Sequence, residues 1–239
     1  MARPARGPRR VTATSERTAW AWGSGLAERF DCHIDASVPL YREGHELILE
    51  LSDWWAAPGA SIVDVGCSTG TLTAALADRH PDVAVLGIDS EPEMLREAQS
   101  RGSRATFRHG DATDCDLGAP DLVVAHYVAQ FLPPATRSRL LRNVFDALQP
   151  GGALVLFEKT LPRSPAAQSR AAQALHSHKL RAGIPADEVL AKDRALRGVL
   201  RPRTTEQLVD ELASVGFEDV EPVMRWMHFA GFLAVKGDQ

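Results

Sequence analysis

The chain has 239 residues, of which 44% are hydrophobic and 24% charged, with a formal net charge of −4 at pH 7. Such a composition fits one ordinary globular domain and argues against a general nucleic-acid surface. Three cysteines (Cys32, Cys67 and Cys115) lack metal-ligand spacing, which favours a reducing, cytoplasmic setting and no metal site. No apolar run reaches the length of a membrane span, so we expect no membrane partner.

The first part of the chain shows weak patterns. Residues 1–15 carry four arginines among Pro, Ala, Gly and Thr, which predicts a disordered tail, with a nucleic-acid arm as the alternative. The remaining residues, 16–239, are expected to form a single domain. A weak helical pattern covers 15–30, a loop broken by proline is expected over 31–41, and apolar spacing predicts a helix over 43–55.

A strand, a tight turn and a helix then follow one another without a gap. Ile62 to Val65 is an apolar run around one acid, Gly66 to Gly70 is bounded by glycines, and Thr71 begins a helical pattern. This order is typical of the entry to a doubly wound α/β sheet, in which ligands bind outside the carboxyl ends of the strands. The absent side chain at Gly66 would let a ligand touch the backbone.

Strands and helices continue to alternate up to residue 158. Further strands are predicted at 83–89, 105–109, 121–126 and 153–158, with helices from 91 and over 134–148. Regular alternation of this kind predicts parallel strands joined by right-handed crossovers.

The last third departs from this alternation. Two helices are predicted over 165–182 and 186–200, and a third begins after an N-cap at Thr204. Two apolar strands, 217–227 and 228–235, lie close enough to pair antiparallel. We therefore expect a helical lid inserted at about 163–203 and a hairpin that completes the sheet.

The glycine turn is consistent with three kinds of functional site. A dinucleotide site requires G-x-G-x-x-G, and Gly66 to Gly70 lacks the second glycine and the spacing of the third. A hydrolase would use Ser68 as the nucleophile of a G-x-S-x-G elbow. That enzyme class needs an oxyanion loop and strands before the elbow, whereas residues 1–60 supply only helical patterns. The third alternative is a binding site for S-adenosylmethionine (SAM).

Four motifs in order resemble those of class I SAM-dependent methyltransferases. The turn from Asp64 to Gly70 resembles the acid-x-Gly-x-Gly-x-Gly motif, with Ser68 in the middle position. Asp89 closes the second strand, where a carboxylate can accept hydrogen bonds from both ribose hydroxyls. Gly110-Asp111-Ala112 follows the third strand, where that family contacts adenine, and Leu148 to Gly152 precedes the fifth. The resemblance implies a Rossmann-like α/β fold with a mostly parallel seven-stranded sheet and an antiparallel C-terminal hairpin.

A longer resemblance, over nearly all of residues 28–236, is to the carboxy-SAM synthase family. The motifs that carry it are Ser37-Val38-Pro39-x-Tyr41, Gly66-Cys67-Ser68, Gln130-Phe131-Leu132, Pro150 to Leu156, Glu158-Lys159, Arg181-Ala182, Arg194 and Phe229-x-x-x-Phe232-x-Ala234-x-Lys236. That family is a homodimeric enzyme of methyltransferase fold. It transfers a carboxyl group from prephenate to the SAM methyl, and carboxy-SAM then serves tRNA wobble-uridine modification.

Position by position, the two resemblances imply a set of residues that contact SAM or carboxy-SAM. The set is Tyr41, Asp64, Gly66, Cys67, Ser68, Gly70, Asp89, Ser90, Asp111, Ala112 and His126. Arg194 matches the arginine that pairs with the extra carboxylate, which in that family comes from the partner subunit. The chain departs from the family at His126, which replaces an asparagine, and at Ser90 and Leu40.

The residues themselves suggest candidates for the chemistry. His126, at the end of the fourth strand, would be a base or acceptor contact because its ordinary pKa is near 6.5, or it would only pack on the cofactor. Tyr127 would shape or fill the substrate pocket. Arg194, with Arg197 and Arg201 at i, i+3 and i+7 of a helix, could grip an anion, or these arginines could form a solvated face. Arg181 is a further candidate for substrate binding.

These observations predict a SAM-dependent methyltransferase that acts on a small anionic molecule, with His126 and Arg194 as catalytic residues. The alternative is carboxy-SAM synthesis from prephenate. A non-catalytic module that keeps the cofactor fold for binding is the third hypothesis. We expect a homodimer with a small-molecule substrate.

Overall fold

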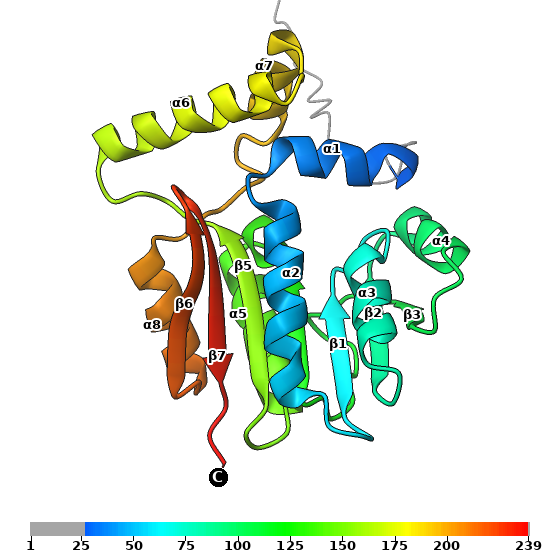
Figure 1. The fold of residues 1–239 in the computed structure, drawn as a ribbon. Coiled ribbons are helices and arrows are strands. Elements are labelled where there is room, and N and C mark those ends of the chain that lie inside the picture. The colour runs from blue at the N-terminus through cyan, green and yellow to red at the C-terminus, as the bar shows by residue number, and fades with distance from the viewer. Residues whose placement is uncertain (1–26, 239) are drawn as a thin grey trace, which may run out of the picture.

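The computed structural model of the chain describes residues 27–238, apart from the side chain of Glu28 (Figure 1). Its centre is a seven-stranded sheet in the order β3-β2-β1-β4-β5-β7-β6. The strands are β1 (Ser61–Val65), β2 (Ala84–Asp89), β3 (Thr106–His109), β4 (Leu122–His126), β5 (Ala153–Lys159), β6 (Asp219–Trp226) and β7 (Phe229–Val235). The first five pair in parallel, and β7 pairs antiparallel with both β5 and β6. The predicted sheet with its C-terminal hairpin is confirmed.

Helices cover both faces of the sheet. On one face α2 (Tyr41–Ser52) and α3 (Thr71–Arg79) pack against alternate strand residues, and on the other α5 (Pro134–Ala147) and α8 (Thr205–Val215) do so. The helix α4 (Pro92–Ser100) lies beside β2 and β3. The N-cap predicted for the last helix is confirmed, since Thr204 and Gln207 form a reciprocal capping box. None of the helices in the described part of the chain has both the length and the apolarity to span a membrane.

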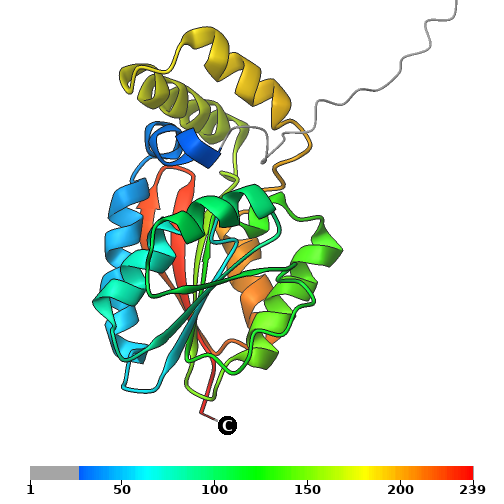
Figure 2. The same ribbon diagram turned by 90° about the vertical axis from the view of Figure 1, so that its right-hand side faces the viewer.

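Three further helices lie beyond the carboxyl ends of the parallel strands. They are α1 (Phe30–Ser37), α6 (Pro165–Arg181) and α7 (Ala186–Ala195), and Figures 1 and 2 show them together above the sheet. Short 3₁₀ turns, η1 (Ala27–Arg29), η2 (Asp53–Trp55) and η3 (Ala129–Phe131), complete the fold. This group of helices covers the edge where ligands of such sheets bind.

Two sequence expectations are wrong in this region. Residues 31–41 are not a loop, because Pro39 lies between two helices, α1 ending at Ser37 and α2 beginning at Tyr41. The helix expected to reach Leu200 ends at Ala195, and Gly198 with φ of +75° follows. Arg197 and Arg201 therefore do not share a helix face with Arg194. The predicted tail at 1–15, and the 15–30 helical pattern before residue 27, lie outside the described residues.

Candidate active site

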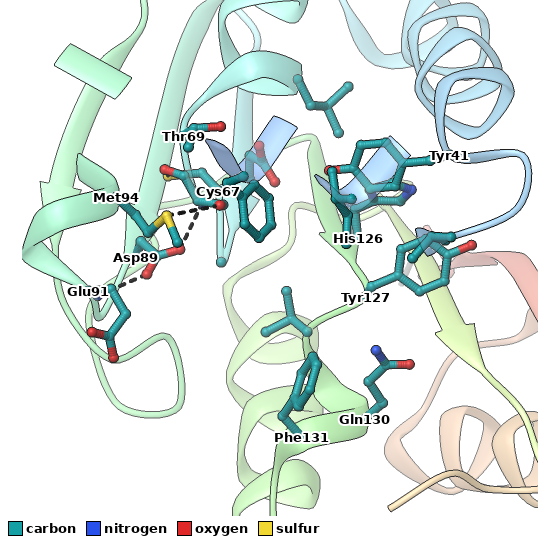
Figure 3. Close-up of a pocket in the computed structure, with 18 of the residues that line it drawn as sticks. Tyr41, Cys67, Thr69, Asp89, Glu91, Met94, His126, Tyr127, Gln130 and Phe131 are labelled. Atoms are coloured by element: carbon teal, nitrogen blue, oxygen red, sulfur yellow. Dashed lines mark hydrogen bonds between the residues drawn. The ribbon is translucent and has the colours of Figure 1, made fainter. Parts of the chain in front are cut away.

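A cavity of about 380 Å³ opens at the carboxyl edge of the sheet. Its walls come from the turns after β1, β2, β3 and β4, from the end of β5, and from α1, α2, α6 and α7. Figure 3 shows part of this lining. Acids and glycines gather at one end, near β1 to β3, and lysines gather at the other, near β5 and the covering helices. We call these the acidic end and the lysine end.

The glycine turn is fixed by backbone hydrogen bonds and by close packing at two glycines. The N–H groups of Gly66 and Cys67 both donate to the carbonyl of Ile88, at 2.7 and 3.0 Å. Gly66 has φ of +70°, and a Cβ there would lie 2.4 Å from a methyl of Val128. Gly70, with φ of +72°, is equally confined, since its Cβ would lie 2.7 Å from that of Ala98. Only glycine fits these two positions without displacing a neighbour.

Asp89, the last residue of β2, is held by backbone donors. The N–H of Ser68 donates to its Oδ2 at 2.7 Å, and the N–H of Glu91 donates to its Oδ1 at 2.9 Å (Figure 3). Burial raises the pKa of Asp89, and these two donors oppose the shift. Each carboxylate oxygen retains capacity for another hydrogen bond, so the group can accept from a pair of ligand hydroxyls.

Two buried groups support the turn. Asp64 is 2% exposed and accepts a hydrogen bond from Thr73 Oγ1 at 2.6 Å, while burial raises its pKa to about 7. Burial likewise raises the pKa of the Cys67 thiol far above its ordinary value. Burial thus favours the neutral thiol at Cys67, which packs in the turn as a small apolar side chain.

The predicted adenine-side residues also line the cavity. Asp111 is exposed, and its Oδ1 accepts the N–H of Thr113 at 2.9 Å, which shapes the loop after β3. Ala112 and Ser90 lie beside it in the lining. The carbonyl of Ser90 accepts a hydrogen bond from His109 Nε2 at 3.0 Å, which ties the loop after β2 to the end of β3.

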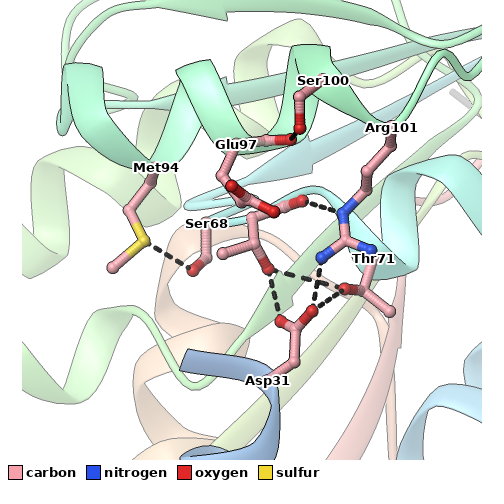
Figure 4. A network of polar contacts seen from close by, with 8 residues as sticks. Asp31, Ser68, Thr71, Met94, Glu97, Ser100 and Arg101 are labelled. Carbon is pink, nitrogen blue, oxygen red and sulfur yellow. Dashed lines mark hydrogen bonds and ion pairs between the residues drawn. The ribbon is translucent and has the colours of Figure 1, made fainter. Parts of the chain in front are cut away.

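The helix α1 is clamped onto the glycine turn by one carboxylate. Thr69 Oγ1 and Thr71 Oγ1 donate to Asp31 at 2.6 and 3.2 Å, and Arg101 forms an ion pair with the same group (Figure 4). Arg101 Nε also donates to the carbonyl of Thr69. Sequence reasoning missed this clamp because it expected a loop at Asp31, and the partners are 38 or more residues away in sequence.

An aromatic wall lies between the two ends. The ring of His126 has its centroid 4.9 Å from Tyr41, 4.8 Å from His45 and 4.6 Å from Tyr127. Burial, reinforced by His45, lowers the pKa of His126 well below 6.5, and burial lowers that of His45 to about 4. Both imidazoles are therefore neutral at pH 7. Within residues 27–238, His126 Nε2 has no hydrogen-bond partner, and it lies 3.2 Å from where a Cβ on Gly44 would stand.

Tyr127 occupies an uncommon backbone conformation. Its φ of +62° is rare for an aromatic residue, and its N–H donates to the carbonyl of Phe157 at 2.8 Å. Burial raises the pKa of its phenol. The conformation turns the chain sharply after β4 and sets the ring into the cavity wall, against Phe157 and Phe229.

Three lysines form the lysine end: Lys159 at the end of β5, Lys179 on α6 and Lys192 on α7. Lys179 is only 4% exposed, and its nearest carboxylate, Asp193, lies 3.8 Å away and also pairs with His176. Within the described chain, Lys159 has no ion pair.

Burial lowers the pKa of all three lysines, and that of Lys192 falls to about 8. Lys192 Nζ lies 2.6 Å from His33 Nε2 and 3.3 Å from Ser37 Oγ, which joins α7 to α1 across the cavity. Three enclosed lysines that outnumber the nearby carboxylates, Asp193 and Glu188, form a site suited to an anion. The sequence placed Lys159 near the substrate side and Lys179 and Lys192 in a basic cluster, but only Arg181 and Arg194 of these cations were predicted to bind substrate.

The two predicted arginines lie elsewhere. Arg181 and Arg194 are exposed and are not part of the cavity lining of their own chain. Their assignment to substrate binding therefore stays a prediction. All the residues predicted to contact the cofactor, except Gly70, line the cavity, as does Tyr127. Within residues 27–238, no cluster of three or more His, Cys, Asp or Glu side chains could hold a metal ion.

Comparisons with known proteins agree with this geometry. A family model described as a methyltransferase domain matches residues 62–152. The carboxy-S-adenosyl-L-methionine synthase of Campylobacter hominis is 32% identical over 215 residues, which cover 88% of this chain and 92% of the relative. The enzyme of the same name from Nautilia profundicola is 29% identical over the same shares of each chain.

Solved structures show the same fold at low identity. A TehB-like SAM-dependent methyltransferase from Corynebacterium glutamicum is 21% identical, with a TM-score of 0.58 over 88% of this chain and 96% of that one. The N-methyltransferase NodS from Bradyrhizobium japonicum, solved with S-adenosyl-L-homocysteine, is 20% identical, with a TM-score of 0.58 over 87% of this chain and 91% of that one.

Proposed function

We propose, from the premise that this chain belongs to the carboxy-S-adenosyl-L-methionine synthase family of SAM-dependent transferases, that it transfers a methyl group from SAM to a small anionic molecule. The observation that carries the proposal is the lysine end of the cavity, where Lys159, Lys179 and Lys192 line one space and outnumber the carboxylates that act on them, Asp193 and Glu188. An anionic second substrate would supply the missing negative charge.

The acidic end fits the cofactor. Asp89 would accept hydrogen bonds from the ribose hydroxyls, and the loop at Asp111 and Ala112 would contact the adenine. The methionine part would lie beside the turn at Gly66 and Cys67, which lines the cavity. When bound, SAM supplies a methyl group activated by the positive charge on its sulfur.

Residues of this chain would then orient the acceptor more than activate it. Methyl transfer depends chiefly on holding the nucleophile in line with the methyl group. The lysines would hold the anionic part, and the rings of Tyr41, His126 and Tyr127 would exclude water. Because burial holds the pKa of His126 well below 6.5, its neutral ring is a weak base and would serve as a hydrogen-bond acceptor for the second substrate through Nε2.

Carboxy-SAM synthesis is the second candidate, and the full-length relationship to enzymes of that name favours it. The same lysines could hold the carboxylates of a prephenate donor, which the family resemblance implies. One departure favours methyl transfer instead: His126 replaces the asparagine that the family has after β4.

Mass spectrometry separates the two reactions. The purified protein is incubated with SAM, once with prephenate and once with small carboxylates, and the nucleotide products and the copurifying nucleotide are identified. S-adenosylhomocysteine with a methylated acceptor supports the proposal, whereas carboxy-SAM formed only with prephenate supports the second candidate. Failure to bind either SAM or S-adenosylhomocysteine in calorimetry would contradict both.

We further propose that the enzyme is a cytoplasmic homodimer in which Arg194 reaches the cavity of the partner subunit. Its exposure on α7 leaves the guanidinium available for that contact. Light scattering would give the molar mass. Mixing Arg194→Ala with Asp89→Asn subunits should restore part of the activity that each lacks alone, because one cavity in the mixed dimer would be intact. Equal inactivity before and after mixing would contradict the shared site.

A further inference from the structure

We propose that Gln130 is a specificity-determining residue that donates a hydrogen bond from its side-chain amide to a carboxylate oxygen of the second substrate. The residue lies in η3, at the start of the segment after β4, and lines the cavity near its lysine end. This inference rests on the proposed function, because it assigns the group that reads the anionic substrate beside the lysines.

The orientation of the amide is fixed by its neighbour. The backbone N–H of Lys159 donates to Gln130 Oε1 at 2.7 Å. Because an N–H can only donate, the oxygen of the amide must face it, and Nε2 must point the other way. Figure 3 shows the nitrogen directed toward the space below Tyr127. Within the described residues Nε2 has no hydrogen-bond partner, so the donor is available to a ligand.

The backbone of Gln130 is held as firmly as its side chain. Its carbonyl accepts the N–H of Arg201 at 2.8 Å, which ties it to the segment that follows α7. Beneath it, Glu158 pairs with Arg137 at 2.8 Å, and both side chains are at most 1% exposed. These contacts fix the end of β5, and therefore the N–H of Lys159. A donor held in this way loses little conformational freedom when a ligand binds.

A carboxylate of the substrate is a better partner for Gln130 Nε2 than a primary amide. A carboxylate accepts hydrogen bonds from every side and would be shared by the amide and an adjacent ammonium group. A primary amide in the same place would bring its own NH₂ toward Nε2 or a lysine, or leave a buried donor unpaired. Gln130 would thus discriminate between an acid and its amide, a distinction that lysines alone make only through charge.

The test is a change of specificity in the enzyme loaded with S-adenosylhomocysteine. Benzoate and benzamide serve as probes, since their rings suit the aromatic wall, and their affinities are measured by NMR titration at neutral pH. Gln130→Glu keeps an oxygen for the Lys159 N–H and replaces the donor by an acceptor. We expect the preference for benzoate over benzamide to fall by about 10- to 100-fold, because a hydrogen bond to a charged group is lost. Gln130→Met should weaken benzoate without favouring benzamide.

Controls separate this inference from the proposed function. Gln149→Glu, the same change at an exposed position, should leave the preference unaltered. All variants should bind S-adenosylhomocysteine like the wild type, which shows that they are folded. If Gln130→Glu leaves the preference for benzoate over benzamide unchanged while Lys159→Met weakens benzoate binding, only the proposed role of Gln130 is contradicted. Benzoate binding that is absent in the wild type, or unaffected by Lys159→Met, would overturn the anion site itself.

Discussion

The two ends of the cavity are built in different ways. The acidic end comes from the turns that directly follow β1, β2 and β3. Its carboxylates already accept hydrogen bonds within the protein, Asp64 from Thr73 and Asp89 from the backbone of Ser68 and Glu91. The lysine end is assembled from β5, α6 and α7, and its three lysines outnumber the carboxylates that act on them, Asp193 and Glu188. The acidic end has its hydrogen bonds formed before any ligand binds, which suits the cofactor that this fold has in common. The lysine end has an excess of positive charge, which an anionic second substrate would balance.

The largest expected effect separates the two ends. Asp89→Ala removes a carboxylate fixed by two backbone donors, and SAM affinity should fall by about 100-fold, the value of losing charge-assisted hydrogen bonds. Calorimetry measures it, with the exposed Asp82→Ala as control. Unchanged SAM affinity in Asp89→Ala would place the ribose elsewhere.

The complementary change acts on the other end. Lys159→Met keeps the length of the side chain and removes its charge, so the second substrate should bind about 10- to 30-fold more weakly, with SAM affinity unchanged. Arg170→Met, an exposed residue of α6, serves as control. A loss of SAM affinity in Lys159→Met would mean that the lysine end holds part of the cofactor.

A pair of alanine substitutions tests why the acidic end is built from glycine. Gly66→Ala meets both a positive φ and the side chain of Val128, whereas Gly59→Ala meets a positive φ of +86° in open space. Strain alone costs about 1 kcal/mol, and the forced displacement of Val128 should add about 1–3 kcal/mol. Denaturant unfolding should therefore show a larger loss for Gly66→Ala. An equal loss of unfolding free energy in the two variants would mean that a methyl group at position 66 fits without displacing Val128.

The smallest effect is a pH dependence confined to the lysine end. The pKa of Lys192 is lowered to about 8, so its ammonium is charged at pH 7 and neutral well above pH 8. Affinity for the anionic substrate should therefore fall a few-fold as pH rises through 8, while SAM affinity stays level. Titrations of Lys192→Met should lack that step. A step that persists in the variant would assign it to another group.

Local sequence was enough to predict the acidic end and most of the sheet. Strand, turn and acid recur within short segments, as from Ile62 to Gly70, and backbone geometry there depends on neighbours in the sequence. The helix α1 was missed because Pro39 resembles a breaker within a loop, whereas it lies between two helices, and the contacts of α1 at Asp31 are with residues distant in sequence.

The lysine end could not be predicted in the same way. Lys179 and Lys192 stand in a stretch that also holds five exposed or half-buried arginines, namely Arg181, Arg194, Arg197, Arg201 and Arg203. Which cations face the cavity is decided by how α6 and α7 pack over α1, and by the end of α7 at Ala195. The family resemblance favoured Arg194, which lies two residues beyond Lys192, the residue of α7 that lines the cavity.

A crystal structure with S-adenosylhomocysteine and a bound carboxylate tests the division of the cavity most directly. The ribose hydroxyls should lie on Asp89, and the added carboxylate should contact Lys159 or Lys192 while the cofactor contacts neither. A structure in which the cofactor's own carboxylate occupies the lysines, with no space for a second anion, would contradict the division.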